Sequence, residues 1–193
     1  MIATRLKQET HAAHQSLEGM MIPAMKQIRQ PRGYAQLLYL FYGYYQPLET
    51  LLEPFVDKYL PDITQRRKAA LILDDLQALG EDITAIPQAT ALPRITTAAQ
   101  AMGALYVLEG STLGGTHIAN MLQKQLGNDT GLSFFRGYGA DTGAKWKTFL
   151  DALNAFPLDE ASEAALIAAA NETFNTLQHW TALHYGSTAN QPA

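Results

Sequence analysis

The chain has 193 residues, of which 47% are hydrophobic and none is cysteine, and its formal net charge at pH 7 is −4. This hydrophobic content is enough for one sizeable core, so we expect a single domain. The lack of cysteine excludes a disulfide framework, a thiolate metal site and a cysteine nucleophile. The acidic balance, with no basic cluster beyond Arg66-Arg67-Lys68, argues against nucleic acid as a partner.

Hydrophobic periodicity predicts an all-α protein, a single-domain helical bundle. In chain order we expect helices over residues 3–18, 31–60, 64–79, 95–126, 142–155 and 159–185. Pro31 suits the first turn of the second helix, Pro47 should bend that helix, and Asp159 suits the N-cap of the last one. Residues 84–96 and 131–143 are expected to be loops.

The ends of the chain and its hydropathy indicate the compartment. No apolar run reaches 18 residues, which argues against a membrane span. The first ten residues are amphipathic and contain no apolar signal-peptide core. We therefore expect a cytoplasmic protein with a helical domain over residues 1–186 and a flexible tail over residues 187–193.

Three glycines, Gly110, Gly114 and Gly115, fall within six residues of an otherwise helical segment. Each glycine costs a helix about 1 kcal/mol relative to alanine, so the segment tolerates a loss of roughly 3 kcal/mol in helix stability. Bare backbone at this point allows a flat or bulky group to approach the helix, and it allows the helix to kink. A tight helix–helix crossing, or a helix that ends at Gly114, would explain the same pattern.

The first helix carries a polar face. Lys7, His11, His14 and Glu18 follow one another at steps of four, three and four residues, so they share that face. Glu18 is one turn beyond His14 and can accept a hydrogen bond from its Nδ1, which leaves Nε2 free to bind a metal. His11 is the rival ligand, and a solvated stripe of weak ion pairs is the alternative interpretation.

Other candidate chemistry is weaker. No Glu-x-x-His spacing of the di-iron type occurs on paired helices, and Ser111 has no obvious base for a hydrolase triad. Phe134 and Phe135 lie in the expected loop over residues 131–143, where exposed aromatic side chains tend to cover a ligand.

Two motifs together resemble a known family. Leu6-Lys-Gln-Glu-Thr-His-Ala-Ala-His-Gln-Ser-Leu-Glu18 is similar to the proximal helix of biliverdin-producing haem (heme) oxygenases, and Leu108-Glu-Gly-Ser-Thr-Leu-Gly-Gly115 is similar to their distal helix. Gly131-Leu-Ser-Phe-Phe135 also resembles a loop of that family. The resemblance covers most of the chain and is strongest to the bacterial, phytochrome-associated type. It implies a fold in which haem lies between an N-terminal proximal helix and a kinked distal helix.

The resemblance also implies roles for individual residues. His14 would be the axial ligand of the haem iron, with Glu18 supporting it. The implied catalytic segment contains Gly110, Ser111, Gly114 and Gly115, the implied propionate-binding residues are Lys7, Arg136 and Lys147, and the implied pocket residues are Phe134 and Phe174. Two positions depart from the family: Ser111 replaces the aspartate of the mammalian type, and Asp151 replaces a second basic residue one turn after Lys147.

The activity implied by the resemblance is oxidative cleavage of haem to biliverdin, CO and ferrous iron. Haem b would be both substrate and cofactor, O2 the oxidant, and a separate redox donor of the ferredoxin, flavodoxin or NAD(P)H reductase type the source of electrons. A phytochrome would be an acceptor of the biliverdin. The alternatives are a non-catalytic haem carrier on the same fold and, more distantly, a thiaminase-like helical enzyme, against which the lack of cysteine counts.

Overall fold

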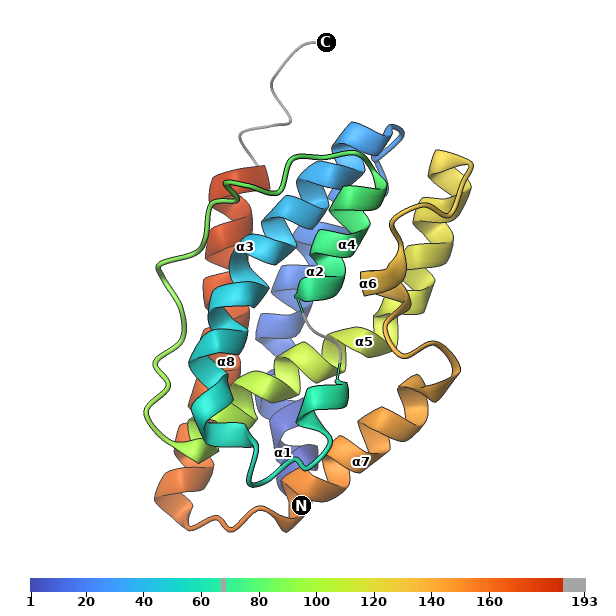
Figure 1. Ribbon diagram of the computed structural model, residues 1–193. Helices are drawn as coiled ribbons and strands as arrows, with labels where there is room; N and C mark the ends of the chain where they lie inside the picture. The colour runs from blue at the N-terminus through green and yellow to red at the C-terminus, as the bar shows by residue number, and fades with distance from the viewer. Residues whose placement is uncertain (67–68, 186–193) are drawn as a thin grey trace.

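The computed structural model describes residues 1–66 and 69–185, and within these ranges the chain is helical with no β-strand. Figure 1 shows the arrangement. The helices are α1 (Ile2–Glu9), α2 (His11–Met25), α3 (Pro31–Val56), α4 (Ala70–Ala78), α5 (Ala98–Leu126), α6 (Ser133–Arg136), α7 (Thr142–Ala155) and α8 (Glu160–Tyr185), with 3-10 turns η1 (Ile63–Gln65) and η2 (Gly139–Asp141). The prediction of an all-α fold is confirmed.

The expected first helix is in fact two helices that meet at Thr10. The Thr10 hydroxyl donates to the carbonyl of Leu6 (2.7 Å), and the backbone at Thr10 leaves regular helical geometry at φ −100°, ψ −1°. A threonine hydroxyl that bonds back to the preceding turn competes in this way with regular helix geometry. The second helix, α2, then continues through Pro23 to Met25, well beyond the expected end at residue 18.

Two further boundaries differ from the prediction. Helix α3 begins at Pro31 as expected but ends at Val56 rather than near residue 60, ahead of Pro61, which disfavours helical backbone in the residue before it. The third expected helix is replaced by the short turn η1 and by α4. The N-cap prediction for α8 is confirmed, because the Asp159 carboxylate accepts a hydrogen bond from the Ser162 N–H (2.8 Å).

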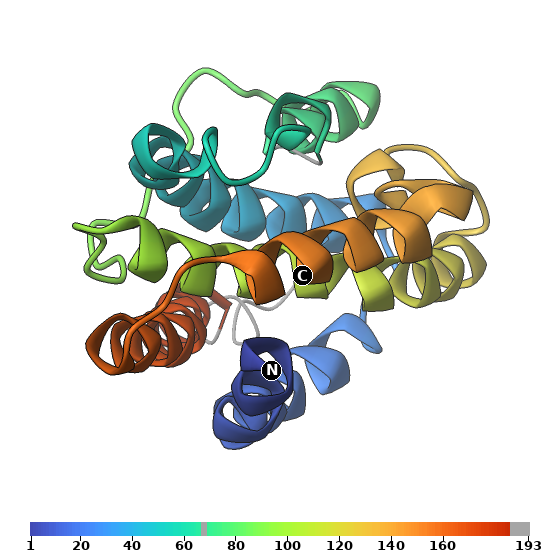
Figure 2. The ribbon, with the colours of Figure 1, turned by 90° about the horizontal axis from the view of Figure 1, so that it is seen from below.

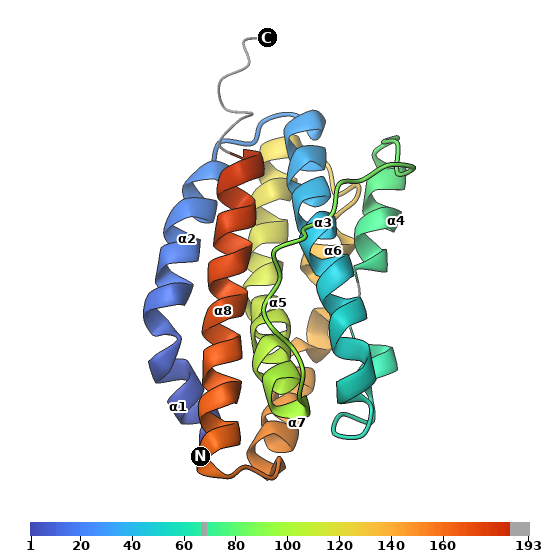
Figure 3. The same ribbon diagram turned by 90° about the vertical axis from the view of Figure 1, so that its left-hand side faces the viewer.

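Helix α5 is the centre of the bundle. It packs against α3, α6, α7 and α8, while α2 packs on the other side of α8 and α4 packs on α3. Figures 2 and 3 show the resulting order of layers, α2, α8, α5, α3 and α4. Helices α5 and α8 approach closely at Gly103, where an added Cβ would lie 2.1 Å from the carbonyl oxygen of Leu166.

Helix α5 is continuous through its three clustered glycines. It begins after Thr97, which forms a capping box with Gln100, and it ends at Gly127 in the left-handed conformation (φ 72°). The interpretation that the helix ends at Gly114 is therefore wrong. Figure 1 instead shows α5 changing direction about halfway along its length, as a helix softened by glycines allows.

No helix in residues 1–66 or 69–185 has the length and hydropathy needed to cross a membrane. The expected tail over residues 187–193 and its boundary at residue 186 lie outside the described residues, so that division stays a prediction.

Candidate functional site

His14 and Glu18 come together on α2, as the spacing predicts. The imidazole Nε2 lies 3.4 Å from Glu18 Oε1, and the His14 side chain is 51% exposed. The Phe174 ring of α8 packs against His14 at 5.5 Å between centroids and an interplanar angle of 61°. The predicted contact through Nδ1 is wrong, because the Glu18 carboxylate reaches the outer end of the ring.

The three glycines of α5 face different surroundings. A Cβ added at Gly110 would lie 3.6 Å from the Trp146 ring of α7, an ordinary contact distance. A Cβ at Gly114 would meet nothing within 4 Å, whereas one at Gly115 would lie only 2.2 Å from the Phe135 carbonyl oxygen of α6. The tight-crossing interpretation therefore accounts for Gly115, and among the three glycines only Gly114 has open space where a Cβ would stand.

Ser111 is held between two helices. Its hydroxyl accepts a hydrogen bond from the Tyr45 hydroxyl of α3 (3.1 Å) and donates one to the Leu108 carbonyl of its own helix (2.7 Å). A serine hydroxyl has one proton and two acceptor positions, so this geometry presents Ser111 as an acceptor. Tyr45 is not among the site residues predicted from the sequence.

The three predicted propionate-binding cations do not all gather at one place. Lys7 is exposed on α1, and α1 contacts α7, which carries Lys147, for example through the Ala3 N–H and the Asn154 side chain (3.2 Å). Arg136 lies on α6, which packs against α4 and α5 instead.

Both Lys147 and Arg136 form ion pairs with neighbouring carboxylates. Lys147 Nζ lies 2.6 Å from Asp151 Oδ2, with the two side chains 77% and 63% exposed. Arg136 lies 3.5 Å from Asp129. The departure from the family at Asp151 thus has a direct consequence, because this carboxylate offsets the charge of the lysine one turn before it.

Phe134 and Phe135 are buried, at 1% and 3% exposure, so the prediction that they cover a ligand from an exposed loop is wrong. The carboxylate of Asp75 on α4 accepts hydrogen bonds from the N–H groups of Ser133 and Phe134 (2.9 and 2.8 Å), which holds α6 against the core. Phe134 packs on the Tyr45 ring at 5.4 Å between centroids. Its contact with the site is therefore indirect, through the tyrosine that holds Ser111.

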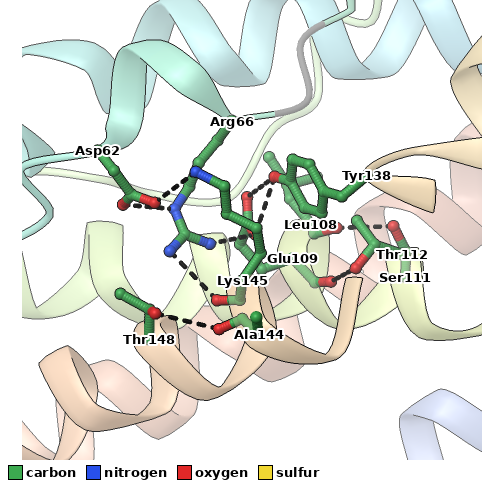
Figure 4. A network of polar contacts seen from close by, with 10 residues as sticks. All are labelled: Asp62, Arg66, Leu108, Glu109, Ser111, Thr112, Tyr138, Ala144, Lys145 and Thr148. Atoms are coloured by element: carbon green, nitrogen blue, oxygen red, sulfur yellow. Dashed lines mark hydrogen bonds and ion pairs between the residues drawn. The ribbon is translucent and has the colours of Figure 1, made fainter. Parts of the chain in front are cut away.

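A polar cluster that the sequence analysis did not identify lies behind the glycines of α5. Glu109 is buried and contacts Arg66 and Tyr138, as Figure 4 shows. The sequence offers a signal for this cluster, since Glu109 directly precedes Gly110 at a position where Leu105, Leu108 and Thr112 predict a buried helix face. A charged residue on such a face requires a partner.

The site residues fit a haem iron better than a metal bound by protein ligands alone. In the part of the chain that the structure describes, no group of three or more His, Asp or Glu residues is placed to hold a metal ion. A single half-exposed histidine with a carboxylate partner, such as His14 with Glu18, suits an iron whose other ligands come from a macrocycle.

Comparison with known proteins points to the same family. The family model described as heme oxygenase matches residues 1–182. A heme oxygenase from Xanthomonas campestris pv. campestris is 36% identical over 111 residues, which cover 56% of this chain and 64% of that protein, slightly less than two thirds of its length.

Solved structures show the same fold. The heme oxygenase from Neisseria meningitidis, solved with NO and CO bound, superposes with a TM-score of 0.81 at 23% identity, over 99% of this chain and 95% of that one. The enzyme from Leptospira interrogans gives 0.76 at 21%, over 93% and 97%, and heme oxygenase-1 from Synechocystis in complex with heme gives 0.76 at 19%, over 97% and 94%. With the family model spanning nearly the whole sequence, the chain belongs to the haem oxygenase family.

Proposed function

We propose that this protein is a haem oxygenase that cleaves haem to biliverdin, CO and ferrous iron. One observation carries the proposal: a half-exposed, carboxylate-supported His14 and an open turn of backbone at Gly114 occur together in a chain of this family. Haem b would supply the iron at which O2 is activated and also the ring that is oxidised.

On the proximal side, one ring nitrogen of His14 would bind the iron while the other donates to Glu18. A carboxylate partner of this kind fixes the tautomer and orientation of an imidazole and makes it a stronger ligand. The edge contact with Phe174 restricts rotation of the ring.

On the distal side, the missing side chain at Gly114 would leave room for the haem and its oxidant next to the helix backbone. Ser111 would order water there as a hydrogen-bond acceptor, with its hydroxyl positioned by Tyr45. The hydroxyl brings no charge, so the proton must come from water that Ser111 orders and not from the side chain acting as an acid.

The haem propionates would be met mainly by Lys7 and Lys147, which stand on the two contacting helices α1 and α7. Arg136 would assist from α6 only if a propionate extends towards it. Because Asp151 offsets Lys147, we propose that the propionates are held less firmly here than at a site with two basic residues.

The reaction needs a separate electron donor, for which we propose a ferredoxin, a flavodoxin or an NAD(P)H-dependent reductase. We propose the cytoplasm as the compartment, because the chain has no cysteine with which to form the disulfides common in small secreted proteins. A phytochrome that takes up the biliverdin remains part of the proposal on the basis of the resemblance alone.

The test is an absorbance time course of the purified protein with one equivalent of hemin, in air, with a reductant. Loss of the Soret band together with growth of a broad red band would establish ring opening. A Soret band that forms and persists with a complete reductase system would favour a haem carrier instead. No Soret shift at all would remove haem from the function.

A further inference from the structure

A buried ion pair lies directly behind the glycine-bearing turn of α5. Glu109 precedes Gly110, and Arg66, which follows η1, reaches across to it with Nη1 2.6 Å from Glu109 Oε2. The two side chains are 4% and 0% exposed. Figure 4 shows the guanidinium inserted between α5 and α7.

The pair connects three separate segments of the chain. Arg66 Nε donates to Asp62 Oδ1 (2.9 Å), and Nη2 donates to the Lys145 carbonyl of α7 (3.3 Å). The Tyr138 hydroxyl lies 3.1 Å from both carboxylate oxygens of Glu109, and Lys145 Nζ lies 2.9 Å from Asp62 Oδ2. One guanidinium therefore joins residues 62–66, α5 and α7.

The neighbouring charges favour the ionised forms of Arg66 and Asp62. Burial alone would lower the pKa of Arg66, but the carboxylates of Glu109 and Asp62 raise it above its ordinary value. Burial would likewise raise the pKa of Asp62, yet hydrogen bonds from Lys145 and Arg66 lower it. Arg66 is thus charged where it contacts Glu109, and apolar residues of similar volume often match or exceed a buried ion pair in stability. Stability alone does not explain its presence.

Apolar packing does not hold the glycine-bearing turn of α5 in place, so the polar contacts must do so. A cavity of about 280 Å³ lies between α3 and α5, and its lining includes Tyr45, Arg66 and Glu109, so apolar side chains do not fill the space behind the turn. The three glycines also give this stretch of α5 poor helix propensity, and its rotation must be fixed by tertiary contacts. Glu109 stands at the beginning of that stretch.

We propose that Arg66 and Glu109 are positioning residues that fix the rotation of the glycine-bearing turn of α5. They thereby set the direction in which Ser111 and the bare backbone at Gly114 face the bound ligand. The proposal rests on the proposed function only for the identity of that ligand, since the restraint itself belongs to the protein without haem.

The first test is hydrogen exchange on the protein without haem. Glu109→Gln keeps the size and an acceptor for Tyr138 but removes the charge, and Arg66→Met removes the cation. We expect amides 110–115 to exchange about tenfold faster in both variants, while amides 98–106 of the same helix change little. The matched control is Glu163→Gln, which breaks the more exposed Arg5–Glu163 pair (2.5 Å) between α8 and α1 and should leave the turn unchanged.

Arg66→Met leaves the buried Glu109 side chain without its cation, and Glu109→Gln leaves Arg66 with Asp62 as its remaining carboxylate, so either single variant can lose stability through its buried charge. The double variant Arg66→Met with Glu109→Met leaves none, so it should fold and still show the faster exchange at residues 110–115. Exchange at the wild-type rate in the double variant would overturn the proposal. Faster exchange spread evenly along α5 would also overturn it, because that pattern means a general loss of stability.

The second test uses the haem-loaded protein and a spectroscopic readout. We expect the C–O stretching band of the ferrous CO complex to shift or broaden in the double variant while the Soret band keeps its wild-type intensity. An unchanged CO band would mean that the pair has only a structural role. If wild-type protein gives no Soret band with hemin, the proposed function fails, and the exchange experiment still decides the role of Arg66 and Glu109.

Discussion

Replacing glycine by alanine at the adjacent positions 114 and 115 of α5 should change the stability of the protein in opposite directions. In Gly115→Ala the new Cβ would lie 2.2 Å from the Phe135 carbonyl oxygen, so α6 must retreat by roughly 1 Å to restore van der Waals contact. Helix α6 has little freedom to do so, because Asp75 holds its first N–H groups and Phe135 is buried. In Gly114→Ala the Cβ meets nothing within 4 Å.

The expected difference in unfolding free energy follows from two opposing contributions, helix propensity and overpacking. Both variants gain about 1 kcal/mol of helix propensity, and Gly115→Ala alone pays for overpacking, which costs about 1–3 kcal/mol. The propensity gain cancels in the comparison, so Gly115→Ala should be less stable than Gly114→Ala by about 1–3 kcal/mol. Each kcal/mol corresponds to about 2–4 °C in melting temperature for a chain of this size.

The assay is urea unfolding of the two variants and the wild type, followed by far-UV circular dichroism. Gly143→Ala on α7 is the control, since its Cβ also meets nothing within 4 Å. Gly114→Ala should lose haem turnover despite unchanged or higher stability, whereas Gly143→Ala should keep it. Equal stability of Gly114→Ala and Gly115→Ala would refute the claim that α6 packs directly on the backbone of α5.

Three further predictions follow from single side chains. His14→Ala should abolish haem turnover yet unfold at the wild-type urea concentration because His14 is half exposed, and unchanged turnover would move the axial role to His11. The pKa of Asp62 in the folded protein is below the ordinary 3.8, so its carboxylate stabilises the fold above pH 3.8. This stabilisation is lost as the pH falls through the pKa of the folded state. Asp62→Asn should therefore flatten the acid limb of a curve of unfolding free energy against pH. Asp151→Arg should tighten haem binding in a hemin titration by up to about fivefold, and weaker binding would contradict the propionate assignment.

The parts of the site that sequence could predict are those within one helix. His14 and Glu18 are four residues apart, so any helix over them brings their side chains together. The same local logic predicted the change of direction in α5 (Figure 1) and the N-cap at Asp159. Helix boundaries near Thr10 were missed, because a side chain that bonds to its own backbone leaves no trace in hydrophobic periodicity.

The parts that sequence could not predict are contacts between distant segments. Arg66 and Glu109 are 43 residues apart, and Asp75 and Ser133 are 58 apart. Nothing in the spacing of either pair indicates that they meet. The burial of Phe134 followed from the second of these contacts, which is why a loop aromatic was expected at the surface and was found in the core.

The glycine motif shows most directly what the structure adds. Sequence indicates that bare backbone is needed at three positions but not what each position faces. Gly115 is needed for α6 to pack, and among the three glycines only Gly114 has open space where a Cβ would stand. The carbonyl of Phe135 presses on α5 one residue after this opening, and Glu109 holds the helix on the preceding turn. The open position is therefore bracketed by two restraints, so a change in either one should alter ligand geometry without touching the ligand.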